Sequence, residues 1–225
     1  MFAALCFNFD NTLCDLWRSE RQVLSQCELG NIAPASLAKQ LVTYKSRGLV
    51  YQQSAHEYIS DAFKHCLPIA DHRTLTEQYL AAFGQTCVLQ PYCEAVLAQL
   101  AQHVPLYLIS NGLANYQRQR INNSGIAQYF EEVVVSGDVG VAKPQRRIFD
   151  LALTPNNLPR QHVLHIGSSL GCDYLVAKQA GVQFCYVNQL GYRHLAEVDY
   201  EVRALSELSA LADYLAEVNS GLSAG

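Results

Sequence analysis

The chain has 225 residues, half of them hydrophobic and only 16% charged, a balance that excludes a disordered protein. Its formal net charge of −4 argues against broad binding to nucleic acid or to a membrane surface. No apolar run approaches the roughly 20 residues that span a bilayer, and the N-terminal residues lack the basic region of a signal peptide, so we expect a cytoplasmic protein.

The first predicted element is a buried strand over residues 3–9, an apolar run that ends in polar residues. Helical periodicity then dominates residues 15–86. Within this block Ser54 and Glu57 have the spacing of a capping box at the start of a helix, and residues 72–83 supply a further expected helix. No strand-like alternation interrupts the block, which predicts an all-helical segment.

After residue 91 the pattern alternates between helices and strands. The predicted strands cover residues 105–110, 132–136, 162–167 and 184–187, and the predicted helices cover 113–124, 145–153, 172–180 and 206–218. Strands separated by helices imply right-handed βαβ units. We therefore expect an α/β fold, with a parallel sheet covered by helices on both faces.

Polar side chains collect where the predicted strands end. They are Asn8, Asp10 and Thr12 after the first strand, Ser110 and Asn111 after the second, Lys143 after the third, and Ser168, Ser169 and Asp173 after the fourth. In such a sheet the ligand site lies beyond the carboxyl ends of the strands. Any one of these residues alone is also compatible with a turn or a solvated charge. Together they suit a phosphate group with Mg²⁺, which prefers hard oxygen ligands.

Four stretches of the sequence are similar to motifs of a known family. FNFDNTL, LISNG, VGVAKPQRRIFDLAL and HIGSSLGCDYLVAKQAG resemble, in order and spacing, the four motifs of the haloacid dehalogenase-like (HAD) hydrolase superfamily. The resemblance covers the whole chain. It implies a Rossmann-like three-layer core domain formed by residues 1–14 and 87–225, with residues 15–86 as a small helical cap domain inserted after the first strand.

The resemblance also implies roles for individual residues. In that family the first Asp of a DxDxT motif attacks phosphorus and forms an aspartyl-phosphate, and the second Asp acts as general acid and base. By this resemblance Asn8 occupies the nucleophile position and Asp10 the acid/base position. Ser110 and Lys143 would hold the phosphate, which makes these four the expected catalytic residues.

A Mg²⁺ site is implied as well, formed by the Asn8 side chain, the main-chain carbonyl of Asp10, and Asp173. Thr12, which supports the loop, and Asn111 complete the expected site as substrate-binding residues. Phosphatase branches keep an aspartate where Asp10 stands, so we expect a phosphomonoester of a small metabolite as substrate. We expect neither nucleic acid nor a membrane as partner, and the sequence sets no oligomeric state.

Two departures from the family pattern bear on activity. Asn8 has no nucleophilic oxygen anion, and Ser168 replaces an acidic residue that is common at its position, so we expect Mg²⁺ to bind weakly. Three interpretations follow: a phosphatase whose nucleophile was changed to Asn, a natural non-catalytic relative that binds a phosphorylated ligand or a protein partner, or an interaction protein that only keeps the fold. The retained Lys143 and Asp173 argue against the third.

The cap carries two further expectations. Trp17 and Arg18 follow the first motif and could face the site, although a tryptophan in the cap core and a solvated arginine are the competing interpretation. We expect the cap to move about hinges near residues 14–15 and 87–90. The eight cysteines are scattered without a C-x-x-C pair, which predicts reduced thiols rather than disulfides or a zinc site.

Overall fold

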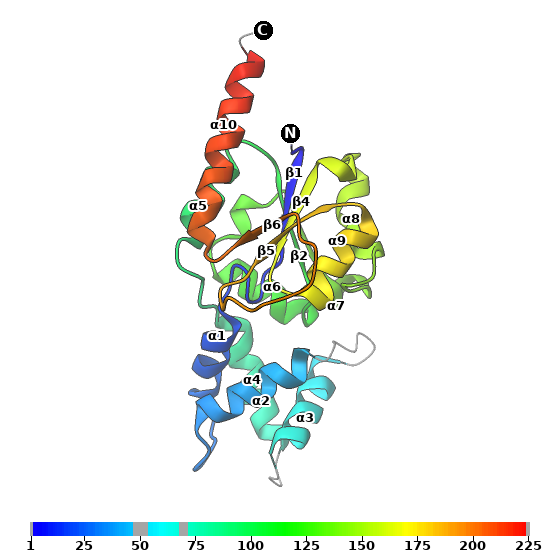
Figure 1. The fold of residues 1–225 in the computed structure, drawn as a ribbon. Helices are drawn as coiled ribbons and strands as arrows, with labels where there is room; N and C mark the ends of the chain where they lie inside the picture. Colours follow the sequence, from blue (N-terminus) through cyan, green and yellow to red (C-terminus); the bar gives the residue numbers. More distant parts are fainter. Residues whose placement is uncertain (1, 47–53, 68–71, 224–225) are drawn as a thin grey trace.

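A six-stranded sheet in the order β3-β2-β1-β4-β5-β6 forms the centre of the core (Figure 1). The computed structural model describes residues 2–46, 54–67 and 72–223. The strands are β1 (Ala4–Phe7), β2 (Leu106–Ser110), β3 (Glu132–Val135), β4 (Val163–Gly167), β5 (Gln183–Val187) and β6 (Tyr200–Val202). Every pairing is parallel, so all the strands end at the same edge of the sheet. The predicted fold class is confirmed.

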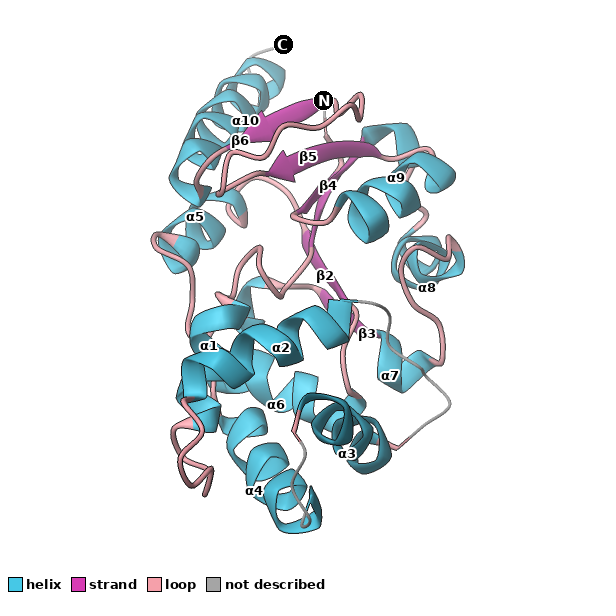
Figure 2. Ribbon diagram, turned by 60° about the horizontal axis from the view of Figure 1, so that its bottom comes forward, coloured by secondary structure: helices cyan, strands magenta, loops and turns pink. Residues whose placement is uncertain are grey.

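Strand β1 shows why the sheet needs helices on both faces. Its four residues are all buried. Because side chains alternate between the two faces of a strand, Leu5 and Phe7 pack into one hydrophobic cluster and Ala4 and Cys6 into another. Residues of α5 (Cys93–Leu100), α6 (Ala114–Asn123) and α10 (Ser209–Ser223) join the first cluster, and residues of α8 (Arg147–Leu153) and α9 (Leu175–Ala180) join the second (Figure 2).

The segment between β1 and β2 begins with a helical cap, as the sequence predicts. The cap consists of α1 (Leu16–Leu24), α2 (Pro34–Ser46), α3 (Ala55–Cys66) and α4 (His72–Gln85), and it has a hydrophobic cluster of its own. The predicted capping box is present: the Ser54 hydroxyl accepts from the Glu57 N–H, and the Glu57 carboxylate accepts from the Ser54 N–H. The cap lies beyond the carboxyl edge of the sheet (Figure 1).

Several elements differ from the prediction. Strand β3 ends one residue early, because Ser136 begins an unpredicted short helix, α7 (Ser136–Val139). Strand β6 was not predicted, because it has three residues and lies at the exposed edge of the sheet beside β5. The helix expected over residues 172–180 starts earlier, as a π-helical turn over Leu170–Tyr174 that leads into α9. This wide turn begins where the Ser169 hydroxyl accepts from the Cys172 N–H, and it places Asp173 at the end of β4.

The cap encloses a buried ion pair. The Glu20 side chain is fully buried, and its carboxylate lies 2.6 Å from the Lys45 ammonium and accepts hydrogen bonds from the Tyr79 hydroxyl. Burial, followed by the charge of Glu20, raises the pKa of Tyr79, so the phenol stays protonated and keeps donating. The Lys45 ammonium also lies over the Tyr79 and Phe83 rings. These contacts connect α1, α2 and α4 inside the cap.

Replacing Glu20 by alanine should destabilise the cap by about 3 kcal/mol, since the mostly buried Lys45 ammonium would lose its counter-charge. Denaturant unfolding followed by fluorescence measures this, because the single tryptophan, Trp17, lies on the same helix. Glu28→Ala removes an exposed carboxylate from the cap and should change the unfolding free energy by no more than about 0.5 kcal/mol. Equal effects of the two substitutions would contradict a structural role for the buried pair.

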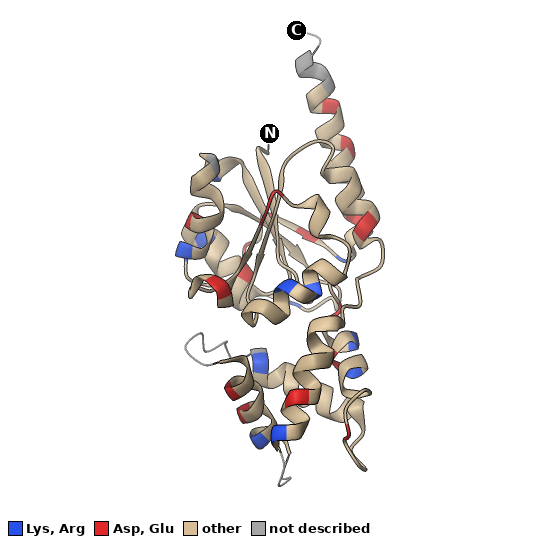
Figure 3. Ribbon diagram, turned by 180° about the vertical axis from the view of Figure 1, so that it is seen from behind, with Lys and Arg blue, Asp and Glu red and all other residues tan. Residues whose placement is uncertain are grey.

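Basic and acidic side chains are interspersed in both the core and the cap (Figure 3). No helix in the described ranges is both long enough and apolar enough to cross a membrane. The mixed charge agrees with the net charge of −4, which gave no reason to expect a surface for polyanions.

Candidate functional site

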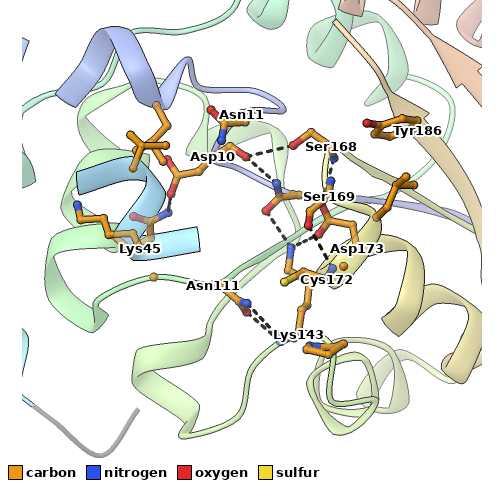
Figure 4. Close-up of a pocket in the computed structure, with 18 of the residues that line it drawn as sticks. Asp10, Asn11, Lys45, Asn111, Lys143, Ser168, Ser169, Cys172, Asp173 and Tyr186 are labelled. Carbon is orange, nitrogen blue, oxygen red and sulfur yellow. Dashed lines mark hydrogen bonds and ion pairs between the residues drawn. The ribbon is translucent and has the colours of Figure 1, made fainter. Parts of the chain in front are cut away.

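A cavity of about 810 Å³ lies at the carboxyl edge of the sheet, where the core meets the cap (Figure 4). The strand ends contribute most of the polar side chains around it. The cap contributes mainly Leu16, Val42 and Phe83, together with Lys45. The cavity therefore has a polar floor on the core side and a more apolar roof on the cap side.

Asn8 lies at the end of β1 and is held by donors and acceptors of fixed kind. Its Oδ1 accepts from the Lys143 ammonium over 2.8 Å, and its Nδ2 donates to the Asp10 main-chain carbonyl over 2.7 Å and to the Thr12 hydroxyl over 3.0 Å. An ammonium only donates and a carbonyl only accepts. These two partners therefore fix the orientation of the amide, and both of its protons are used.

The Lys143 ammonium is buried below Asn8 and uses all three of its protons. It donates to Asn8 Oδ1, to the Ile109 carbonyl over 2.8 Å and to Asp173 Oδ1 over 2.7 Å. Asn111 holds the backbone of the same residue from both sides, since its side chain accepts from the Lys143 N–H and donates to the Lys143 carbonyl. Lys143 is thus fixed at both its backbone and its charged end.

Asp173 is the anionic partner of Lys143. Its Oδ2 accepts from the N–H groups of Ser168 and Ser169, each over 3.0 Å. Burial would raise the pKa of Asp173, but the charge of Lys143 and the contact with His165 outweigh it and hold the pKa below its usual range. A Cβ at position 167 would lie 2.6 Å from this carboxylate, so only the glycine found there permits the approach. Asp173 is therefore a buried carboxylate.

Asp10 points away from Asn8, toward helix α6. Its Oδ1 forms an ion pair with the fully buried Arg120 at 2.8 Å, and its Oδ2 accepts from Gln117 Nε2 over 2.8 Å. Burial alone would lower the pKa of Arg120, but the negative charge of Asp10 and of neighbouring groups outweighs burial and raises the pKa above its usual value. The guanidinium therefore stays charged. The carboxylate at the predicted acid/base position is thus held by two side chains of one helix.

Two predicted ligand-binding residues lie outside the cavity lining, and a third lines it with its side chain already bonded to the protein. Thr12 is fully buried and does not line the cavity; its hydroxyl donates to Ser168 Oγ over 3.1 Å, which suits support of the loop rather than contact with a ligand. Ser110 is also buried away from the cavity, and Gln117 donates to its hydroxyl. Asn111 lines the cavity, but its side chain is committed to the backbone of Lys143.

The residues expected after the first motif do not reach the site. Trp17 is 40% exposed, with the Arg21 guanidinium over its ring, and Arg18 pairs with Asp15 at the start of α1. Neither lines the cavity, whereas Leu16 of the same helix does. The helical periodicity explains this result, because consecutive residues of a helix point to different sides.

The residues present do not fit a strong Mg²⁺ site. Among the described residues no group of three or more His, Cys, Asp or Glu side chains is placed to hold a metal ion. The Asp10 carbonyl faces an amide N–H, and both oxygens of Asp173 already accept from Lys143 and two main-chain N–H groups. Hard cations require free oxygen ligands. The predicted ligands are neighbours, but each has another partner.

Three residues around the site were missed by sequence reasoning. Gln117 and Arg120 are separated by three positions on the helix after the second motif, a spacing that places them on one face. His165 is buried in β4, with Nδ1 3.1 Å from the Cys6 carbonyl and Nε2 3.4 Å from Asp173 Oδ1. Polar residues inside an apolar strand or on a buried helix face were the only signal.

Comparison with known proteins agrees, over most of the chain, with the family resemblance of the sequence motifs. A family model described as haloacid dehalogenase-like hydrolase matches residues 5–187. The pyrimidine 5'-nucleotidase YjjG of Escherichia coli is 33% identical over 51% of this chain and 51% of its own length. The chain thus spans about half the length of the first curated relatives it matches. An (S)-2-haloacid dehalogenase of Pseudomonas sp. is 27% identical over 92% of this chain and 94% of its own.

One solved structure extends this comparison to the fold. The putative HAD-hydrolase YfnB of Bacillus subtilis, determined bound to magnesium, superposes with a TM-score of 0.76 at 24% identity. It covers 94% of this chain and 98% of its own. At this identity the likeness concerns the fold, and it includes the helical segment after β1.

Proposed function

Since the chain belongs to the haloacid dehalogenase-like hydrolase family, we propose that it keeps the phosphate site of a small-metabolite phosphatase but does not hydrolyse its ligand, because Asn8 stands at the nucleophile position. The ligand is a small phosphomonoester. The cavity between core and cap holds it, with the phosphate toward Lys143 and the remainder toward the apolar cap side chains.

The orientation of Asn8 carries the proposal. Its N–H fills the 2.7 Å gap to the Asp10 carbonyl. An aspartate in the same place would set a carboxylate oxygen against that carbonyl, two acceptors that repel each other unless a cation or a proton offsets them. In this chain the amide N–H takes over that function. Asn8 therefore removes the nucleophile and, by the same change, the need for a divalent cation.

Local charge supports phosphate binding without a metal ion. Lys143 pairs with Asp173 and Arg120 pairs with Asp10, so with a neutral Asn8 these groups sum to no net charge. A phosphate dianion is a stronger acceptor than a neutral amide oxygen. We propose that Lys143 exchanges its bond to Asn8 for one to the phosphate, and that Mg²⁺ contributes little.

Asp10 favours phosphate over a haloacid as the ligand. The Asp10 carboxylate is retained two residues after the nucleophile position and is held by Arg120 and Gln117. In the family that the motifs resemble, the phosphatase branches have an aspartate at this position. The haloacid dehalogenases among the relatives make the competing ligand a 2-halocarboxylate.

We further propose that the core comprises residues 1–14 and 87–225 and that residues 15–86 form a separate cap domain.

Titration calorimetry with inorganic phosphate tests the proposed function. We expect phosphate to bind to the unsubstituted protein. Millimolar Mg²⁺ should change the affinity for phosphate by less than about threefold, ~0.7 kcal/mol. In Asn8→Asp, where a second acceptor faces the Asp10 carbonyl, Mg²⁺ should raise the affinity by at least about tenfold, ~1.4 kcal/mol.

The same titration with 2-chloropropionate separates the two ligand classes. Binding of the halocarboxylate in preference to phosphate would contradict the assignment, and so would phosphate binding that depends on Mg²⁺ equally in both proteins. Asn11→Asp is the matched control, since it adds one carboxylate to the same loop at an exposed position of the cavity lining, not against the Asp10 carbonyl. It should change the Mg²⁺ dependence by less than Asn8→Asp does.

A further inference from the structure

Two cysteines lie on the two chain segments that connect the core with the cap. Cys14 follows β1 and precedes α1, and Cys87 follows α4. The segments run side by side, because the Asp15 N–H donates to the Val88 carbonyl over 2.8 Å and Cys14 forms an isolated antiparallel bridge with Leu89. The two cysteines therefore lie on neighbouring segments, where the chain enters and leaves the cap.

The guanidinium of Arg120 joins this thiol pair to the site. Its Nη2 donates to Cys14 Sγ over 3.2 Å and its Nε donates to the Thr86 carbonyl over 3.2 Å, while Nη1 faces Asp10. The Ser19 hydroxyl lies 3.3 Å from the same sulfur. Cys14 Sγ thus accepts a hydrogen bond from a buried guanidinium, and a neighbouring positive charge favours a thiolate.

The pKa values of Cys14 and Cys87 are shifted in opposite directions. The hydrogen bond from Cys87 and the charge of Arg120 lower the pKa of Cys14 although burial opposes them, and the same hydrogen bond, with burial, raises the pKa of Cys87. Burial dominates elsewhere, raising the pKa of Cys93 to about 12 and that of Cys27 to about 11. Cys14 is therefore the more acidic thiol of the pair, and its sulfur is placed to take the proton of Cys87 when the pair has lost one proton.

We propose that Cys14 and Cys87 are a redox site, and that small-molecule disulfides convert the pair to a disulfide that cross-links both connections between core and cap. Cys87 is half-buried and Cys14 is fully buried, so the reagent reaches Cys87 first. Oxidation would bind the two segments covalently and so restrict the motion of the cap relative to the core.

The reaction balances as two thiol–disulfide exchanges. Cys87 Sγ attacks one sulfur of the reagent RSSR as its proton passes to Cys14 Sγ, and the first RS⁻ leaves. This RS⁻ takes the proton from Cys14, whose thiolate attacks Cys87 Sγ and expels the second RS⁻. The two protein sulfurs lose two electrons in all, RSSR gains them, and the products are the protein disulfide, one RSH and one RS⁻.

Oxidised glutathione, mass spectrometry and peptide mapping test the proposal on the full chain. We expect the intact mass to fall by two hydrogen atoms, a peptide cross-linked through Cys14 and Cys87, and full reversal by dithiothreitol. The half-buried Cys27, Cys66 and Cys172 serve as internal controls for exposure. The pair should react at least about tenfold faster than these three.

Substitutions separate the contributions within the pair. Cys14→Ser should stop the reaction at a glutathione adduct on Cys87 or prevent it, and Arg120→Lys, which keeps the charge but loses the forked donors, should slow the cross-link. Equal reactivity of all half-buried cysteines, a different first disulfide, or a glutathione adduct at Cys87 that never resolves in the unsubstituted chain would overturn the proposal. These readouts need no ligand, so failure of the proposed function would leave them unaffected.

Discussion

Asn8→Asp should turn the protein into a Mg²⁺-dependent phosphatase, with hydrolysis of p-nitrophenyl phosphate at least about 10³-fold above that of the protein as it stands. The substitution places a carboxylate oxygen anion where the structure has an amide, at the end of β1 and beside the cavity. By the family resemblance, we expect the new aspartate to attack phosphorus and to carry the phosphoryl group as an acyl phosphate. Asp10, whose carboxylate is turned toward Arg120 and Gln117 in this structure, would have to turn toward the ligand to act as acid and base.

Two control variants identify the source of any new activity. Asn11→Asp adds the same charge to the loop without a nucleophile and should stay inactive. Asn8→Asp with Asp10→Asn should lose most of the gain, by about 10²–10⁴-fold, the usual contribution of general acid–base catalysis. An Asn8→Asp protein that folds, binds phosphate and hydrolyses no member of a broad phosphomonoester panel would show that the site lacks more than its nucleophile. Release of halide from 2-chloropropionate would instead assign the scaffold to the dehalogenases.

Lys143→Met should abolish phosphate binding and destabilise the fold by about 3–5 kcal/mol, because the substitution leaves a buried carboxylate without its cation. Three acceptors converge on the ammonium, among them Asp173, which is almost completely buried. Calorimetry measures the loss of binding and denaturant unfolding measures the loss of stability. Lys39→Met, which removes one exposed positive charge from the cap, should alter neither quantity by more than about 0.5 kcal/mol.

A double substitution separates the two effects of Lys143. Lys143→Met with Asp173→Asn removes both charges, so part of the lost stability should return, while phosphate binding should stay absent. Phosphate that still binds to either variant would place the anion somewhere other than this edge of the sheet. Stability that does not recover at all would show that the bonds from Ser168 and Ser169 to the carboxylate, rather than the charge pair, govern the fold at this point.

Much of the fold follows from local sequence pattern. The apolar run around β1 and the alternation of helices and strands after residue 91 predicted a parallel sheet, because each pattern depends only on neighbours along the chain. The capping box at Ser54 was readable for the same reason. The sixth strand was not, since a three-residue segment at an exposed edge has too little apolar surface to show a period.

The sequence by itself also determined which polar residues gather at the carboxyl edge, because parallel strands must all end there. It showed directly that an amide stands at position 8. Only the tertiary structure decided which partner each polar group has. The Asn8 amide donates to the Asp10 carbonyl, and the Lys143 ammonium donates all three of its protons to protein acceptors. The Asp10 carboxylate pairs with Arg120. Hydrogen-bond partners and burial depend on contacts between segments distant in the chain, and no local pattern encodes them.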